Sequence, residues 1–212
     1  MSIAHKNIET LRDIRSMMER SSRFISLSGW SGIFAGVFAL AGAWIAGRKI
    51  AEYNAVNDPA TACISCLSND LTIIALAVFI AAFVSAVLFT AYRSRKDGVA
   101  FWGPVSRRLL WNTMMPMLVG GLVIWRMAEQ GYYDFIAPSM LIFYGLALIN
   151  GSKYTMGEIR FLGYSEIVVG ITSLFFLPAG LYFWAIGFGV LHIIYGIAMW
   201  WKHERNAAQE RA

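Results

Sequence analysis

Two ionisable side chains, Glu166 and His192, stand in residues 161–201, a segment with no other acidic or basic residue. Proteins use carboxyl and imidazole groups to hold or transfer protons and to bind polar ligands. A tight turn at Pro178–Gly180 divides the segment, and its centre, Ala179, is thirteen residues from each of the two groups. At about 1.5 Å per residue, both lie roughly 20 Å from the turn. We therefore predict that they touch across two antiparallel helices, directly or through one water.

Small residues share the helix faces of both groups, which should let the two helices approach closely: Gly163, Gly170 and Ser173 with Glu166, and Gly189 and Gly196 with His192. A carboxyl and an imidazole in contact titrate as a pair. Two interpretations stay open, a hydrogen-bonded latch that fixes the hairpin and a ligand or proton site. In both, we expect that replacing one partner destabilises the protein more than replacing both, because it strands a buried polar group.

Asn112 and Asn150 form a second matched pair, since each is nineteen residues from Gly131, the predicted centre of another turn. Pro116 lies one helical turn from Asn112 and should kink its helix and free a backbone carbonyl. All four polar residues are predicted in the cytoplasmic half of the protein. We therefore take Glu166, His192, Asn112 and Asn150 as candidate ligand-binding residues around one polar cavity.

The only two cysteines, Cys63 and Cys66, lie in a predicted loop on the non-cytoplasmic side, where they could form a disulfide. Attachment of haem would require histidine after the second cysteine, and that residue is Leu67. None of the three histidines lies in this loop, so no metal site is predicted. A thiol oxidoreductase normally relays electrons between two cysteine pairs, and we therefore favour a structural disulfide over a redox centre.

The elements that position these residues are long apolar segments. Of the 212 residues 58% are hydrophobic and only 15% are charged, against about 25% in soluble domains. Apolar segments of this length indicate membrane-spanning helices. We predict an all-α bundle of six transmembrane helices at about residues 24–46, 71–92, 109–128, 135–150, 161–177 and 181–201.

Basic residues predict the orientation of this bundle. Fifteen of the 18 Lys and Arg residues fall on one side of the predicted membrane, and only Arg48, Lys49 and Arg126 fall on the other. The positive-inside rule therefore places both termini in the cytoplasm. It also explains the net charge of +5 without a nucleic-acid partner.

Three parts of the chain follow from this topology. Residues 1–23 form a cytoplasmic segment in which 7–23 has the spacing of an amphipathic helix, either lying on anionic lipid or packed under the bundle. Residues 24–201 are the six-span membrane domain, and residues 202–212 are a cytoplasmic tail.

Two stretches resemble a group of known proteins: MMERSSRFISLSGWSG at 17–32, and FYGLALINGSKYTMGEIRFLGYSE at 143–166 continuing to FWAIGFGVLHIIYGIAMW at 183–200. They are similar to uncharacterised bacterial inner-membrane proteins with several spans, and the similarity covers much of the chain. It implies a multi-pass protein of the bacterial inner membrane and carries no activity, ligand or site residue.

The leading functional hypothesis is a non-enzymatic membrane protein that binds or transports a small ligand at the polar site, without a cofactor. The signatures of soluble enzymes are absent from the sequence. The first alternative is a structural, sensory or assembly subunit that docks a partner membrane protein or a second copy through small-residue helix faces, such as Gly32 and Gly36. The second is a membrane thiol oxidoreductase. Water access to Glu166 would favour ligand binding, and a dry contact with His192 would favour the subunit.

Overall fold

The computed structural model describes residues 28–55, 63–96 and 102–205. The predicted N-terminal amphipathic helix lies outside these residues, as does most of the C-terminal tail. The described part of the chain is helical throughout, with no strand, which confirms the all-α prediction. Its helices are α2 (Gly29–Asn54), α3 (Ile64–Lys96), α4 (Pro104–Glu129), α5 (Ile136–Gly151), α6 (Gly157–Phe175), α7 (Gly180–Trp184) and α8 (His192–Met199).

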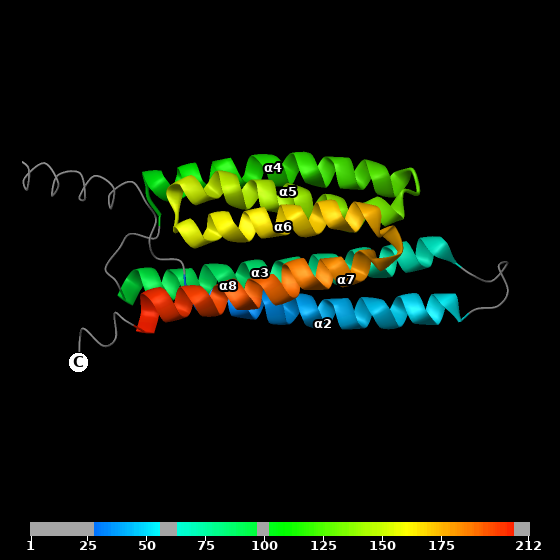
Figure 1. The fold of residues 1–212 in the computed structure, drawn as a ribbon, viewed down its shortest axis with the longest axis horizontal. Coiled ribbons are helices and arrows are strands. Elements are labelled where there is room, and N and C mark those ends of the chain that lie inside the picture. Colours follow the sequence, from blue (N-terminus) through cyan, green and yellow to red (C-terminus); the bar gives the residue numbers. More distant parts are fainter. Residues whose placement is uncertain (1–27, 56–62, 97–101, 206–212) are drawn as a thin grey trace, which may run out of the picture.

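The last helical rod, residues 180–205, is one continuous helix in which two π-helical segments alternate with the α-helices α7 and α8. A π-helical segment, Ala185–Leu191, joins α7 to α8, and a second one, Trp200–Arg205, follows α8. Helices α7 and α8 are therefore parts of one rod that runs the length of the bundle (Figure 1). The rods also extend beyond the predicted spans, most clearly α3, which was predicted to cover only residues 71–92.

Four helical stretches are long and apolar enough to cross a membrane, which is consistent with an integral membrane protein: Gly29–Asn54, Ile64–Lys96, Tyr133–Tyr154 and Leu177–Lys202. Helices α4 and α6 are not among them. Charged residues lie in the first turns of both helices: Arg107 and Arg108 in α4, and Glu158 and Arg160 in α6. The six-span count and the orientation stay predictions.

The helices form two groups that run side by side (Figure 1). Helix α5 lies between α4 and α6 in one group, and α2 packs against both α3 and the last rod in the other. The last rod also contacts α5 and α6, so it joins the groups. Within the described residues, α3 makes extensive contact only with α2, which leaves most of its apolar surface exposed.

Close approach between helices depends on glycine. A Cβ added to Gly145 of α5 would lie 2.7 Å from the Gly163 carbonyl oxygen, and one added to Gly163 of α6 would lie 2.8 Å from the Gly145 oxygen. Likewise, Gly36 of α2 lies against the backbone of Gly189. The small-residue faces are therefore used inside this chain, where they allow the backbone contact that membrane helices favour. Their partners differ from the prediction, because the face of Gly163 and Gly170 packs on α5 and the face of Gly189 and Gly196 packs on α2, so neither face joins the two helices of the predicted hairpin.

Candidate functional site

Three titratable side chains meet where α5, α6 and the last rod converge. Tyr144 comes from α5, Glu166 from the middle of α6, and His192 from the first residue of α8. Glu166 is 0% exposed and His192 is 7% exposed, so this is a buried polar cluster among apolar helices. The predicted contact is present, with His192 Nδ1 at 3.4 Å from Glu166 Oε1.

His192 has a hydrogen-bond partner on each ring nitrogen. Its Nδ1 lies 3.0 Å from the carbonyl oxygen of Gly187, and its Nε2 lies 2.8 Å from the Tyr144 hydroxyl. A carbonyl oxygen can only accept, so Nδ1 carries a hydrogen and donates it to Gly187. In the neutral imidazole, Nε2 then accepts the hydrogen bond that Tyr144 donates. The ring is thereby satisfied without Glu166.

Glu166 is in the opposite condition. Within the described residues, neither of its carboxyl oxygens has a hydrogen-bond partner, and both are buried. The nearest donor is His192 Nδ1, which lies closer to Gly187 than to the carboxyl group. Buried polar groups are nearly always hydrogen-bonded, and exceptions often mark functional positions. Glu166 is such an exception.

The π-helical segment shapes this site. The segment ends at Leu191, directly before His192. The His192 side chain forms its hydrogen bond with the carbonyl of Gly187, five residues earlier in the same helical segment. A Cβ added to Gly187 would lie 2.5 Å from Glu166 Oε2 and would also collide with Leu141. Gly187 therefore supplies both the carbonyl for the imidazole and the space for the carboxyl group. Short π segments inside α-helices are frequent at functional sites.

Two aromatic rings stack on the imidazole. The Tyr144 ring stacks on His192 with 5.4 Å between centroids, and Phe188 stacks on it at 6.1 Å. Tyr144 and Phe188 also contact one another at 5.1 Å. These contacts fix the plane of the ring, so the positions of both nitrogens are determined by packing as well as by hydrogen bonds.

No protein-family model, curated protein or solved structure matches this chain. The function therefore has to be inferred from the chemistry of the buried groups. Among the described residues, no three His, Cys, Asp or Glu side chains are grouped so that they could hold a metal ion. A carboxyl group and an imidazole in contact can form hydrogen bonds and exchange a proton.

Tyr144 and Gly187 were not among the residues predicted from the sequence. A signal for Tyr144 was present, because it lies thirteen residues after Gly131, the same distance that separates Glu166 and His192 from their own turn. Gly131 adopts a positive φ of 77° at the end of α4, as expected for a turn glycine. The depth argument would thus have added the tyrosine. Nothing in the sequence indicates the π segment that positions Gly187.

Asn112 and Asn150 contact each other, and their role is explained by Pro116. A proline cannot donate to the carbonyl four residues earlier, which here belongs to Asn112. That carbonyl instead accepts a hydrogen bond of 2.8 Å from the Asn150 side-chain amide. The Asn112 side chain bonds back to the Arg108 carbonyl within α4. Asn150 therefore satisfies the carbonyl that Pro116 leaves without its helical donor, and it ties α5 to α4.

The four predicted polar residues consequently fall into two separate pairs. Asn150 lines a groove between α4 and α5, and neither Glu166 nor His192 is among the residues that line it. Ser165, the residue directly before Glu166 in α6, lies 3.2 Å from Tyr195, so a further polar contact connects α6 and α8 next to the cluster.

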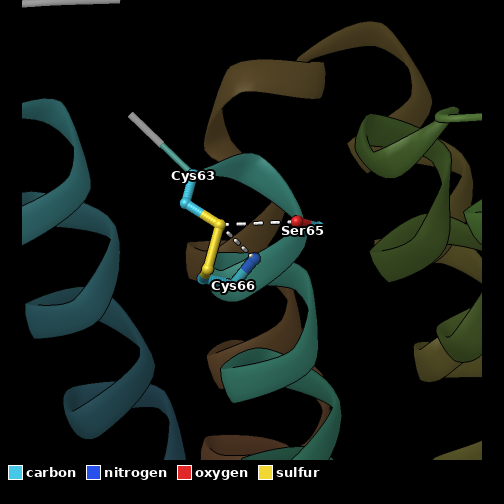
Figure 2. Close-up of a disulfide and its surroundings, with 3 residues drawn as sticks. All are labelled: Cys63, Ser65 and Cys66. Atoms are coloured by element: carbon cyan, nitrogen blue, oxygen red, sulfur yellow. Dashed lines mark hydrogen bonds between the residues drawn. A yellow bond between two sulfur atoms is a disulfide. The ribbon is translucent and has the colours of Figure 1, made fainter. Parts of the chain in front are cut away.

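Cys63 and Cys66 are joined by a disulfide at the start of α3 (Figure 2). Cys63 Sγ also accepts a hydrogen bond from the Cys66 backbone N–H and lies 3.4 Å from the Ser65 hydroxyl. Both cysteines are exposed, and the sequence contains no second pair to which electrons could pass.

Replacing both cysteines with serine is expected to change the thermal unfolding temperature in detergent by no more than a few degrees. The two cysteines are only three positions apart in the sequence, so the disulfide closes a short loop and lowers the conformational entropy of the unfolded chain only slightly. Thermal unfolding of the double variant in detergent checks this. A large loss of stability, or an altered thiol–disulfide state of other envelope proteins in cells, would contradict a purely local role.

Proposed function

We propose that the chain is a proton-binding integral membrane protein in which Glu166 and His192 hold a proton inside the helix bundle. The observation that carries this proposal is the fully buried Glu166 carboxyl group, which accepts no hydrogen bond within the described residues although a histidine lies 3.4 Å away. Four apolar helices long enough to cross a membrane support the bilayer as its environment.

A proton is favoured because the bare carboxylate is the costly state. Burying an ionised carboxylate without a partner costs several kcal/mol after relaxation. Two arrangements avoid this cost, a neutral carboxylic acid beside neutral imidazole and a carboxylate paired with imidazolium. Each contains one more proton than the bare carboxylate beside neutral imidazole, so the pair binds one proton whichever group carries it.

The size of the site supports the proton over a larger ligand. The space around the carboxyl group is so small that a single methyl group added to Gly187 would overlap both Glu166 and Leu141. Glu166 is completely buried, and the described groove lies elsewhere. The small ligand predicted from the sequence is therefore, in this proposal, the proton itself.

Proton binding here would act on the last helical rod. The imidazole, the Gly187 carbonyl and the carboxyl group lie together at the π-helical segment, so a change of charge on the pair alters the hydrogen bonds that hold that segment. The topology predicted from the basic residues puts the site in the cytoplasmic half of a bacterial inner membrane. We propose a protein that senses or transports protons there.

Infrared difference spectroscopy of the protein in lipid bilayers tests the proposal. Titration should reveal the C=O stretch of a carboxylic acid in a water-poor environment, and Glu166→Gln should remove that signal. Glu129→Gln is the matched control, because Glu129 is exposed and pairs with Arg126 at 2.8 Å at the end of α4. Reconstituted vesicles loaded with a pH dye then report whether Glu166→Gln also abolishes proton flux.

The two measurements have separate meanings. If titration reveals neither a carboxylic acid signal that Glu166→Gln removes nor an imidazolium signal that requires His192, the proton site is wrong. If the signal is present but no flux depends on it, the protein binds a proton without transporting it, and sensing is the remaining role.

The alternative of a structural or assembly subunit is favoured by one observation, the complete burial of Glu166. In that case the pair only holds α6 to α8, and an apolar Glu166→Leu/His192→Leu protein should keep its activity. Loss of activity in a stably folded double variant would decide for the proton site.

A further inference from the structure

A groove of about 490 Å³ runs along the α4–α5 contact, away from the buried cluster. This volume is within the range of ligand-binding sites in proteins, about 300–1,000 Å³. Its lining is apolar apart from its last two members: Met115, Pro116, Val119, Phe143, Leu146, Ile149, Asn150 and Lys153.

The polar residues lie at one end of this groove. Asn150 is in the last turn of α5, and Lys153 follows directly after the helix, whereas Phe143 is in its middle. Lys153 is exposed, and its ammonium group donates one hydrogen bond of 3.1 Å to Asn150 Oδ1. An ammonium group has three N–H donors, so Lys153 can bind an anion while it keeps this contact.

The hydrogen bond of Asn150 to the Asn112 carbonyl holds this end of the groove in place. Asn150 therefore links the Asn112 carbonyl of α4 to the ammonium group of Lys153 through its side-chain amide. The lysine is positioned by the fold, instead of extending freely from the surface.

The length of the groove matches one leaflet of a bilayer. Phe143 and Lys153 are ten residues apart, which corresponds to about 15 Å along a helix. The hydrocarbon core of a bilayer is about 30 Å thick, so the groove covers roughly half of it. Its charged end would then lie at the level of the headgroups.

We propose that this groove binds one anionic phospholipid, with the headgroup phosphate on Lys153 and an acyl chain along Met115, Val119 and Leu146. These three side chains are exposed, as required for contact with a lipid chain. The charge of Lys153 selects an anionic headgroup, and anionic lipids are the ones that juxtamembrane lysines attract. The proposal depends on the membrane location of the chain and does not depend on the proton site.

Native mass spectrometry of the full chain in detergent tests it, with phosphatidylglycerol and phosphatidylcholine of identical acyl chains as probes. Lys153→Gln should weaken phosphatidylglycerol binding about fivefold, the effect of roughly one lysine near the surface, and weaken phosphatidylcholine binding less, because the choline cation offsets the charge of its phosphate. Lys96→Gln is the matched control, because Lys96 is an exposed lysine in the last turn of α3, away from the groove.

A second pair of variants tests the acyl-chain part. Leu146→Trp should fill the groove and reduce the binding of both lipids, whereas Leu118→Trp, on an exposed position of α4 that does not line the groove, should not. Should Leu146→Trp fail to fold by circular dichroism, Val119→Trp takes its place. Equal effects of Lys153→Gln and Lys96→Gln, or unchanged lipid binding when the groove is filled, would overturn the proposal.

Discussion

Replacing His192 with leucine is expected to destabilise the protein by roughly 3 kcal/mol, whereas replacing Glu166 with leucine should change its stability by less than about 1 kcal/mol. Leucine at position 192 removes the partner of the Tyr144 hydroxyl and the ring N–H that lies 3.4 Å from the Glu166 carboxyl group. Leucine at position 166 strands nothing, because the imidazole keeps both Tyr144 and the Gly187 carbonyl.

This asymmetry differs from the expectation drawn from the sequence, in which each single replacement was worse than the double one. The reason is that the imidazole does not rely on the carboxyl group. Combining both replacements should give an intermediate result, since the Tyr144 hydroxyl and the Gly187 carbonyl then lose the imidazole but no carboxyl group is stranded. Unfolding in sodium dodecyl sulfate, measured for the three variants side by side, checks the order. Equal losses for the two single variants would show that the carboxyl–imidazole contact dominates after all.

Gly187→Ala is expected to cost about 3 kcal/mol or more, the upper end of the range for overpacking a buried site. The added methyl group would overlap Glu166 Oε2 and Leu141, and Leu141 is itself completely buried, so neither neighbour can move aside easily. The thermal unfolding temperature in detergent should therefore fall by several degrees.

Gly121→Ala provides the matched control for this prediction. It is the same substitution inside a helix, but a Cβ at Gly121 meets no atom within 4 Å, so stability should be unchanged or slightly higher. Adding Glu166→Ala to Gly187→Ala should recover part of the lost stability, because it removes the overlap with the carboxyl group. The recovery should be incomplete, because the overlap with Leu141 remains. A Gly187→Ala protein as stable as the Gly121→Ala protein would mean that the π-helical segment can shift to make room.

The apolar helices of the chain and the meeting of its two buried titratable groups could be predicted because both depend on position along a helix axis. An apolar helix rises by a fixed distance per residue, so counting outward from the turns at Gly131 and Ala179 gives depth directly. The same reasoning predicted that Pro116 would free a carbonyl and that Asn112 and Asn150 would lie level with each other. In the structure that carbonyl is the one Asn150 binds.

Depth does not specify which helices face one another, and here the sequence was insufficient. It predicted one polar cavity for four residues in the same half of the bundle, whereas neither Glu166 nor His192 lines the groove that Asn150 lines. The two alternatives for the pair, a latch or a site, also could not be separated, because both need the same spacing.

By itself, then, the sequence determined the all-α class, the long apolar helices and the level at which Glu166 and His192 meet, because periodicity and hydropathy are local properties. Only the tertiary structure decided that Tyr144, 48 residues from His192, completes the cluster. It also decided that the imidazole bonds to Gly187 and leaves the carboxyl group without a hydrogen bond in the described structure. These features depend on helix rotation and on a π-helical segment, both of which are fixed by side-chain packing between helices far apart in the chain.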